Sequence, residues 1–205
     1  MQPVDLALCL AIDVSASVDF AEFGLMVGGL AAAFREADIA AACAAGPKGG
    51  VAVAVLFWSG SAEVAVPWMR IDGEAAAGAL AEAIDNAPRL PQPGATALGP
   101  GMVAALALLA ACPAEAARLA LDVSGDGAHN QGRPPGPVRD LGVDAGVTIN
   151  GLAVLNEEPD LLAHYEAEVI GGPGAFSMSC ADYADFAQAI RRKLLREIRG
   201  GALVA

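Results

Sequence analysis

Residues 6–19 have the sequence LALCLAIDVSASVD, and this stretch decides the fold. The apolar run from Leu6 to Ile12 is too short for a helix and is typical of a strand buried on both faces. Polar residues follow at once, and Asp19 and Glu22 have the spacing of a helix N-terminal capping box. A buried strand that leads through a short polar turn into a helix is the beginning of an α/β fold.

The rest of the chain alternates in the same way between strand patterns and helix patterns. Short apolar runs predict strands at 51–58, 63–68, 119–124, 148–155 and 176–180. Apolar residues that recur at spacings of three and four predict helices that include the stripes Phe20, Phe23, Val27, Leu30, Phe34; Leu80, Ile84; Leu98, Met102, Leu106, Leu109; and Tyr183, Ala187, Ile190, Leu194, Ile198. Asp182 is expected to cap the last of these helices.

The strand at 63–68 differs from the others because it contains Pro67 and follows the turn residues Ser59, Gly60 and Ser61. It is therefore predicted to be an edge strand that pairs in a hairpin. The complete pattern predicts a three-layer α/β fold, in which a mostly parallel six-stranded sheet has one antiparallel edge strand and helices on both faces. No repeat, linker or charge block divides the chain, so we expect a single domain over residues 1–205.

The composition excludes several classes of protein. The chain has 205 residues, of which 55% are hydrophobic and 18% charged, and this balance excludes intrinsic disorder. Its formal net charge of −12 argues against nucleic acid and anionic membranes as partners. No apolar run has the roughly 18 residues that a transmembrane segment needs. No secretory leader is visible before the first strand, which fits a cytoplasmic protein or a leader removed from the chain.

The four cysteines are Cys9, Cys43, Cys112 and Cys180, which lie far apart in the sequence. They form no CxxC pair, so a structural zinc site is not expected. Cys9 lies inside an apolar run and is expected to be a small core residue. For the set as a whole, the sequence leaves both free thiols and one or two disulfides open. It leaves the oligomeric state open as well.

Oxygen-bearing side chains are expected to meet at one edge of the sheet. In open α/β sheets, ligands bind beyond the carboxyl ends of the strands. Asp13, Ser15 and Ser17 alternate directly after the first strand, Asp126 follows the strand at 119–124, and Thr96 lies in a loop before a helix. Two carboxylates at one sheet edge repel each other unless a proton or a cation lies between them. Carboxylate and hydroxyl oxygens suit Mg²⁺, Ca²⁺ or Mn²⁺.

These residues resemble the metal-ion-dependent adhesion site of von Willebrand factor type A domains, because the DxSxS turn at 13–17 is followed in order by Thr96 and Asp126. The resemblance covers about residues 6–199. Within that superfamily the chain is similar to a bacterial family of unknown function. The passages that carry this likeness are AIDVSASVD, FWSG, the PW near residue 67, LDVSGDG, TINGLAVLN, VIGGPGAF and AIRRKLLREI.

The resemblance implies a von Willebrand A fold with a divalent metal held by Asp13, Ser15, Ser17, Thr96 and Asp126. Mg²⁺ is the first expectation, with Ca²⁺ and Mn²⁺ as alternatives. We expect hydroxyl groups in the inner coordination shell, while the aspartates bind directly or through water. An Asp or Glu of a protein partner would occupy the remaining position, which makes the chain a non-enzymatic binding or adhesion module. Many members of the superfamily are exported, so a periplasmic or secreted location is expected, with the cytoplasm as the alternative.

Two other functions stay open at this point. A metal-assisted hydrolase would use a metal-bound water with His129 as its base. His129 is also where the chain departs from the family, because His129-Asn130 stands where paired asparagines are expected. A purely structural domain would use the metal for stability alone. In the DVSGDG passage at 122–127, Asp122 is expected to be a buried structural residue and Ser124 a supporting hydrogen-bonding residue.

The only basic cluster is expected to be a solvated face of the last helix, with docking of an acidic partner as the alternative. Its members are Arg191, Arg192, Lys193, Arg196 and Arg199.

Overall fold

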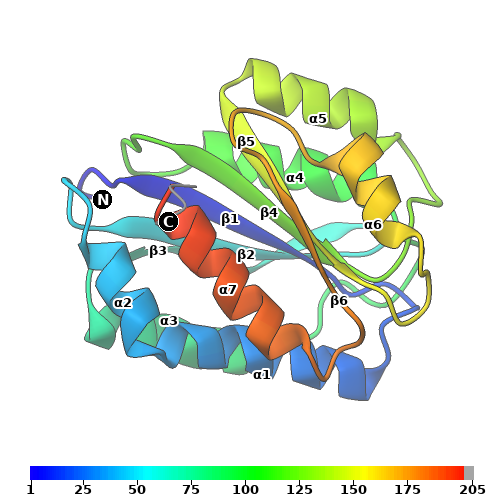
Figure 1. Cartoon of the computed structure of the whole chain (residues 1–205), viewed down its shortest axis with the longest axis horizontal. Helices are drawn as coiled ribbons and strands as arrows, with labels where there is room; N and C mark the ends of the chain where they lie inside the picture. Colours follow the sequence, from blue (N-terminus) through cyan, green and yellow to red (C-terminus); the bar gives the residue numbers. More distant parts are fainter. Residues whose placement is uncertain (201–205) are drawn as a thin grey trace.

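The computed structural model describes residues 1–200 and shows one sheet between two layers of helices (Figure 1). The strands of the sheet are β1 (Leu6–Asp13), β2 (Val51–Trp58), β3 (Ala62–Ile71), β4 (Leu119–Gly125), β5 (Val147–Val154) and β6 (Ser177–Cys180). Their spatial order is β3-β2-β1-β4-β5-β6, and β3 alone runs antiparallel to its neighbour. The predicted three-layer fold with one antiparallel edge strand is therefore confirmed.

The helices divide between the two faces of the sheet. One face carries α1 (Phe20–Arg35), α2 (Ala37–Ala44), α3 (Glu74–Asp85) and α7 (Phe186–Ile198). The other carries α4 (Leu98–Ala110), α5 (Pro135–Asp144), α6 (Leu161–His164) and a short π-helix at Tyr165–Val169. Each layer buries its own hydrophobic cluster against the sheet, so strands β1 and β2 are buried along their whole length.

The order of the strands fixes where a ligand can bind. β1 lies between β2 and β4, so the chain leaves β1 and β4 for different sides of the molecule. α1 follows β1 on one face, whereas the segment after β4 leads to α5 on the other. This divergence opens a crevice at the carboxyl ends of β1 and β4. The predicted oxygen-bearing residues follow these two strands.

The helix at 20–35 confirms its predicted start but not the full extent of its apolar stripe. Asp19 accepts from the Glu22 N–H at 2.8 Å, and Glu22 accepts from the Asp19 N–H at 2.7 Å, which makes the predicted capping box. Phe20, however, is 82% exposed, whereas Phe23 and the later stripe residues are buried. Helical periodicity defines a face but does not reveal how far a helix extends beyond the layer on which it packs.

The last helix differs from its prediction at three points. It begins at Phe186 after Asp185, while Asp182 accepts hydrogen bonds from the Ala184 and Asp185 N–H groups one turn earlier. Ala187 is exposed, and Ala189 takes its place in the core. Lys193 is completely buried, so the solvated basic face predicted for this helix is wrong at that residue. The same 3.6-residue period that buries Ile190 and Leu194 also buries position 193.

Within residues 1–200, all four cysteines are free thiols, and Cys9, Cys43 and Cys180 are buried. The described part of the chain contains no helix with the length and apolar character needed to cross a bilayer.

Candidate functional site

Three chain segments meet at the carboxyl ends of β1 and β4. The Ser17 hydroxyl donates to Asp126 Oδ1 at 2.6 Å and lies 3.0 Å from the Ser15 hydroxyl oxygen. The Thr96 hydroxyl donates to Ser15 Oγ at 3.5 Å, and the Ser15 N–H donates to Asp13 Oδ1 at 2.8 Å. The structure therefore brings all five predicted residues into one connected cluster.

The turn that carries Asp13, Ser15 and Ser17 is held in place by its backbone. The Val14 N–H donates to the Trp58 carbonyl at 2.8 Å, and the Ala16 N–H donates to the Gly94 carbonyl at 2.9 Å. These bonds tie the residues between the oxygen-bearing positions to neighbouring segments. Side chains at alternate positions are then directed to the same side.

Arg89 supports the same turn and was not predicted from the sequence. Its Nη2 donates to the carbonyl oxygens of Ser15 at 3.2 Å and Val18, and its guanidinium lies 5.3 Å from the centre of the Phe23 ring. A single arginine in a loop has no periodicity or motif that would reveal this role.

Asn130 fixes the loop that carries Thr96. Its side-chain Oδ1 accepts from the Thr96 N–H at 2.9 Å, and its own N–H donates to the Thr96 carbonyl at 3.1 Å. From the sequence, position 130 stands out only as half of an expected asparagine pair. The neighbouring His129 is half-buried, and its Nδ1 has no hydrogen-bond partner among the described residues.

Both carboxylates of the cluster are buried and incompletely paired. Asp13 and Asp126 are fully buried, and each has an Oδ2 atom without a hydrogen-bond partner within residues 1–200. The pKa of Asp13 is raised to about 7, mainly by burial and also by the nearby charge of Asp126, against the lowering effect of hydrogen bonding by Ser15. Burial also raises the pKa of Asp126, against the lowering effect of its bond from Ser17. The ionised pair therefore calls for a further positive partner.

Tyr165 lies behind the cluster. A Cβ atom built on Gly125 would lie 2.8 Å from Asp13 Oδ2 and 3.0 Å from the Tyr165 hydroxyl oxygen, so these two groups face the same glycine. Burial, followed by the charge of Asp13, raises the pKa of Tyr165 well above its usual value. Tyr165 begins the π-helix, more than 30 residues after Asp126, and no sequence signal links it to this site.

A groove of about 460 Å³ lies against the cluster. Ser17, Thr96 and Asp126 line it together with Glu157 and Glu158, which lie after β5. Glu158 Oε1 accepts from the Ala128 N–H at 3.1 Å, which ties this acidic segment to the loop after β4. The cluster therefore faces a groove with an acidic wall.

Asp122 and Ser124 lie inside the sheet and outside the cluster. Asp122 is completely buried and pairs with Lys193 at 2.6 Å, and the Ser124 hydroxyl donates to Asp122 Oδ1 at 3.2 Å. This confirms the structural role predicted for Asp122. Within residues 1–200, no group of three or more His, Cys, Asp and Glu side chains is placed to hold a metal, so any ion at the 13–17 turn would depend on hydroxyl ligands.

The comparisons with solved structures identify the fold. A von Willebrand factor type A protein from Catenulispora acidiphila has a TM-score of 0.66 and 19% identity over 96% of this chain and 43% of its own. Proximal thread matrix protein 1 from the mussel byssus, with a zinc-occupied MIDAS motif, has a TM-score of 0.63 and 18% identity over 95% of this chain and 46% of its own. This chain thus spans less than half the length of these two proteins.

A third similar structure is the conserved hypothetical protein BatB from Bacteroides thetaiotaomicron. Its TM-score is 0.60 and its identity 15%, over 94% of this chain and 98% of its own. Identities this low show a shared fold and nothing more. No curated protein sequence matches the chain.

A sequence family matches almost the whole chain. The family is described as "Protein of unknown function (DUF1194)", and its match covers residues 3–202. Because that match spans far more than half of the sequence, the chain belongs to this family of unknown function, and its fold is that of von Willebrand factor type A domains.

Proposed function

We propose that the chain is a non-enzymatic binding module that holds a divalent cation at Asp13, Ser15, Ser17, Thr96 and Asp126. The observation that carries the proposal is the pair of buried carboxylates, each with an unpartnered oxygen, joined by a chain of hydroxyl groups. A buried ionised carboxylate without partners is strongly unfavourable, and a cation between the two removes that penalty. The zinc-occupied MIDAS motif of the mussel protein supports a divalent cation in general.

The donor set fits a hard cation. All five side chains offer oxygen, which suits Mg²⁺ first and Ca²⁺ or Mn²⁺ as alternatives. Three of the five are neutral hydroxyl groups, so with these in the inner shell and the aspartates bound through water the ion keeps much of its positive charge. When bound, the ion would supply an electrophilic position that faces the groove at Ser17 and Thr96. An Asp or Glu side chain of a partner protein is the ligand that matches such a position.

Metal binding is tested first, by thermal unfolding in EDTA and in millimolar Mg²⁺, Mn²⁺ or Ca²⁺. A ligand at about 100 times its dissociation constant should raise the free energy of unfolding by about 2.7 kcal/mol. Asp13→Asn should lose this increase. Asp144→Asn is the matched control, because it makes the same change at an exposed carboxylate of α5. An equal response of the two variants, or no response of the wild type, would contradict the proposal.

The open position is tested separately with a defined carboxylate. Mn²⁺ bound at the site should accelerate the relaxation of water protons, because the ion retains exchangeable water. Acetate should reduce this effect by displacing water, whereas acetamide, which has similar size and no charge, should not. A site closed to outside ligands would respond to neither compound, which would favour a purely structural metal.

A location outside the cytoplasm completes the proposal. It rests on the family resemblance and on similar structures, which include a minor pilin from Streptococcus sanguinis and an aerotolerance-related membrane protein from Bacteroides fragilis. Fractionation of the source cells tests it, and recovery in the cytoplasmic fraction would support the alternative.

The hydrolase alternative makes a different prediction, because it requires turnover that depends on both the metal and His129. Phosphoester and ester substrates, assayed with the wild type and His129→Ala, distinguish it from a binding module. Metal-dependent turnover that His129→Ala abolishes would contradict a non-enzymatic module and support the hydrolase.

A further inference from the structure

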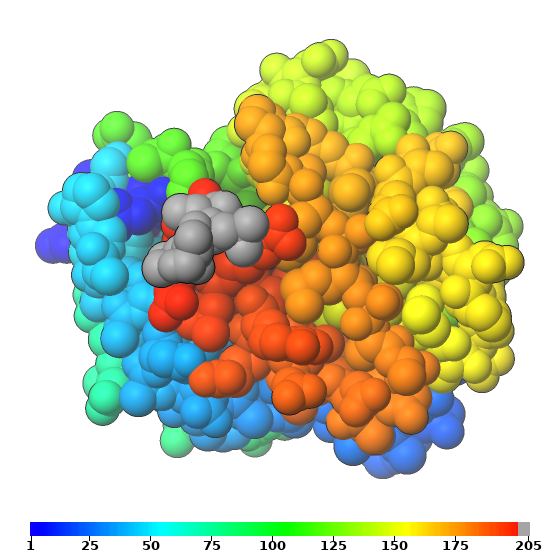
Figure 2. Space-filling model, viewed as in Figure 1, coloured from blue at the N-terminus to red at the C-terminus, as the bar shows by residue number. Residues whose placement is uncertain are grey.

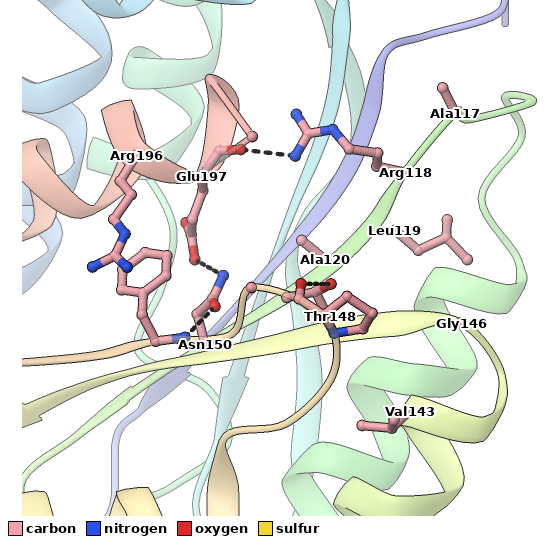
Figure 3. A pocket seen from close by; sticks show the side chains of 14 residues that line it. Ala117, Arg118, Leu119, Ala120, Val143, Gly146, Thr148, Asn150, Arg196 and Glu197 are labelled. Carbon is pink, nitrogen blue, oxygen red and sulfur yellow. Dashed lines mark hydrogen bonds between the residues drawn. The ribbon is translucent and has the colours of Figure 1, made fainter. Parts of the chain in front are cut away.

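A second cavity lies at the amino ends of β4 and β5, at the opposite end of the strands from the candidate metal site. It has a volume of about 530 Å³ and lies between these strands and the last turns of α7 (Figure 3). Its polar and aromatic lining consists of Arg118, Thr148, Asn150, Phe176, Arg196 and Glu197. It shares no residue with the groove at Asp126. On the outer surface, α7 runs between the helices at the beginning of the chain and the segment before β6 (Figure 2).

Glu197 is the central feature of this cavity. It is only 4% exposed, and its Oε1 accepts from Asn150 Nδ2 and from Lys193 Nζ, both at 2.8 Å. Its Oε2 has no hydrogen-bond partner within the described residues. Lys193 also pairs with Asp122 at 2.6 Å, so one buried cation serves two buried carboxylates. Because buried polar atoms normally have partners, the free oxygen of Glu197 indicates an incomplete site.

The charge of Glu197 depends on this environment. Its pKa is raised to about 8, mainly by burial and also by the charge of Asp122, against the opposing effect of Lys193. The raised pKa favours the protonated form of Glu197, which is a neutral hydrogen-bond donor. Lys193 and Asp122 then balance each other.

Two guanidinium groups lie at the rim of the cavity, on either side of Glu197 in Figure 3. Arg118 uses two of its N–H groups on the carbonyl oxygens of Glu197 and Ile198, at 3.1 and 2.7 Å, and so keeps further donors. The Arg196 guanidinium stacks 3.8 Å from the centre of the Phe176 ring. The rim is thus positive, although the whole chain has a net charge of −12.

We propose that this cavity binds a small organic anion whose carboxylate or phosphate oxygens pair with Arg118 and Arg196 and accept a hydrogen bond from Glu197. Guanidinium groups match both of these anions because their donors lie in one plane. The cavity volume falls within the range of about 300–1,000 Å³ that is typical of small-molecule sites. Phe176 offers an apolar surface for the rest of the ligand and Thr148 a hydroxyl group, while the Asn150 amide bonds to Glu197 Oε1 and the Phe176 N–H and so holds the cavity wall in place.

The test uses benzoate and phenyl phosphate as two anionic probes and benzamide as their uncharged counterpart. EDTA is present throughout, so that no metal at the other edge of the sheet competes for the anions. Binding is followed by titration calorimetry and by the amide NMR shifts of Thr148, Asn150 and Phe176. We expect at least one anion to bind and to shift these signals, whereas benzamide does not. The two anions separate a carboxylate ligand from a phosphate ester.

Two arginine variants distinguish the site from general attraction between charges. Arg196→Gln should weaken anion binding by about tenfold or more, because it removes a charge-assisted hydrogen bond. Arg192→Gln makes the same change on an exposed residue of the same helix that does not line the cavity, and it should have no effect. Absence of binding by both anions, equal binding of benzamide, or equal losses in the two variants would overturn the proposal.

A pH series tests the part assigned to Glu197. The charged groups that face it are Asp122 of β4, Lys193 and Arg196 of its own helix, and Arg118 before β4. Anion affinity of the wild type should fall as the pH rises through about 8, when Glu197 becomes charged. Glu197→Gln stays neutral and should show no such fall. The same pH dependence in both proteins would overturn the assignment of Glu197 as the donor.

Discussion

Gly125 ends β4 directly behind the candidate metal site, and the lack of a side chain there matters because of the close approach of other groups. A Cβ atom would lie 2.8 Å from Asp13 Oδ2 and 3.0 Å from the Tyr165 hydroxyl. The distance to Asp13 Oδ2 is too short for a real contact and the distance to the Tyr165 hydroxyl is at the lower limit, and both neighbours are buried. The position therefore accepts only glycine without a shift of Asp13.

We predict that Gly125→Ala lowers the free energy of unfolding by about 1–3 kcal/mol, as is usual for overpacking. It should also reduce the stabilisation by metal, since Asp13 must move. Gly78→Ala in α3 is the control, because nothing lies within 4 Å of its Cβ and alanine favours a helix by roughly 0.5–1 kcal/mol. Chemical denaturation with and without Mg²⁺ measures both effects. A Gly125→Ala protein as stable as the wild type would contradict the crowding argument.

At the scale of single residues, the sequence predicts the position of a side chain where the spacing between residues fixes its direction. Alternation after a strand was enough to place Asp13, Ser15 and Ser17 on one side of a turn. It could not identify Arg89 or Tyr165, because their roles arise from contacts between distant segments. The burial of Lys193 could not be predicted either, because a basic residue is expected to be exposed unless its buried acidic partners are known.

At the scale of elements, α7 is joined to the sheet by charge as well as by apolar packing. Its Lys193 and Glu197 form a buried network with Asp122 of β4 and Asn150 of β5. Removing one partner from such a network generally costs more than the network contributes, because a buried charge is left alone. The pH dependence of this network follows from Glu197.

We predict that the free energy of unfolding falls between about pH 4.5 and pH 8 because of Glu197. Its pKa is raised from 4.5 to about 8 in the folded chain, so folding favours its protonated form. That contribution is complete below pH 4.5 and is lost as the pH rises through about 8. Glu197→Gln lacks this loss, so the wild type should become less stable relative to the variant across that range and level off above it.

Denaturant unfolding of both proteins in EDTA at several pH values measures this difference. Other carboxyl groups, including Asp13, titrate in both proteins and cancel in the comparison. Glu63→Gln, on the exposed face of β3, is a control that should follow the wild type. Parallel curves for the wild type and Glu197→Gln would show that Glu197 titrates normally.

The elements themselves were predictable to different degrees. The strands at 51–58 and 119–125 are buried on both faces, so their apolar runs marked them clearly. α2 and α5 were not predicted, because α2 is short and rich in alanine and α5 contains prolines and glycines within its first turns. Neither helix has a distinct apolar stripe, and contacts with the rest of the molecule stabilise them.

At the scale of the whole molecule, the two candidate sites lie at opposite ends of β4. Asp126 follows the carboxyl end of the strand, and Arg118 precedes its amino end. The rule that ligands bind beyond the carboxyl ends of parallel strands was enough to locate the first site. No comparable rule points to the amino ends, so the second cavity could be found only from the structure.

The candidate metal site combines residues 13–17, 96 and 126, which come together only when β1 has paired with β4 and the loop before α4 has docked. A cation that binds there recognises a nearly complete native chain. Contacts that form late in folding are absent from the folding transition state, and we expect the contacts of this site to be among them. Saturating Mg²⁺ should therefore slow unfolding and leave the refolding rate unchanged, which stopped-flow measurements with and without EDTA can check. Faster refolding in Mg²⁺ would instead mean that the cluster assembles early. On the expected outcome, the ion determines how long each folded molecule persists after it has reached its native shape.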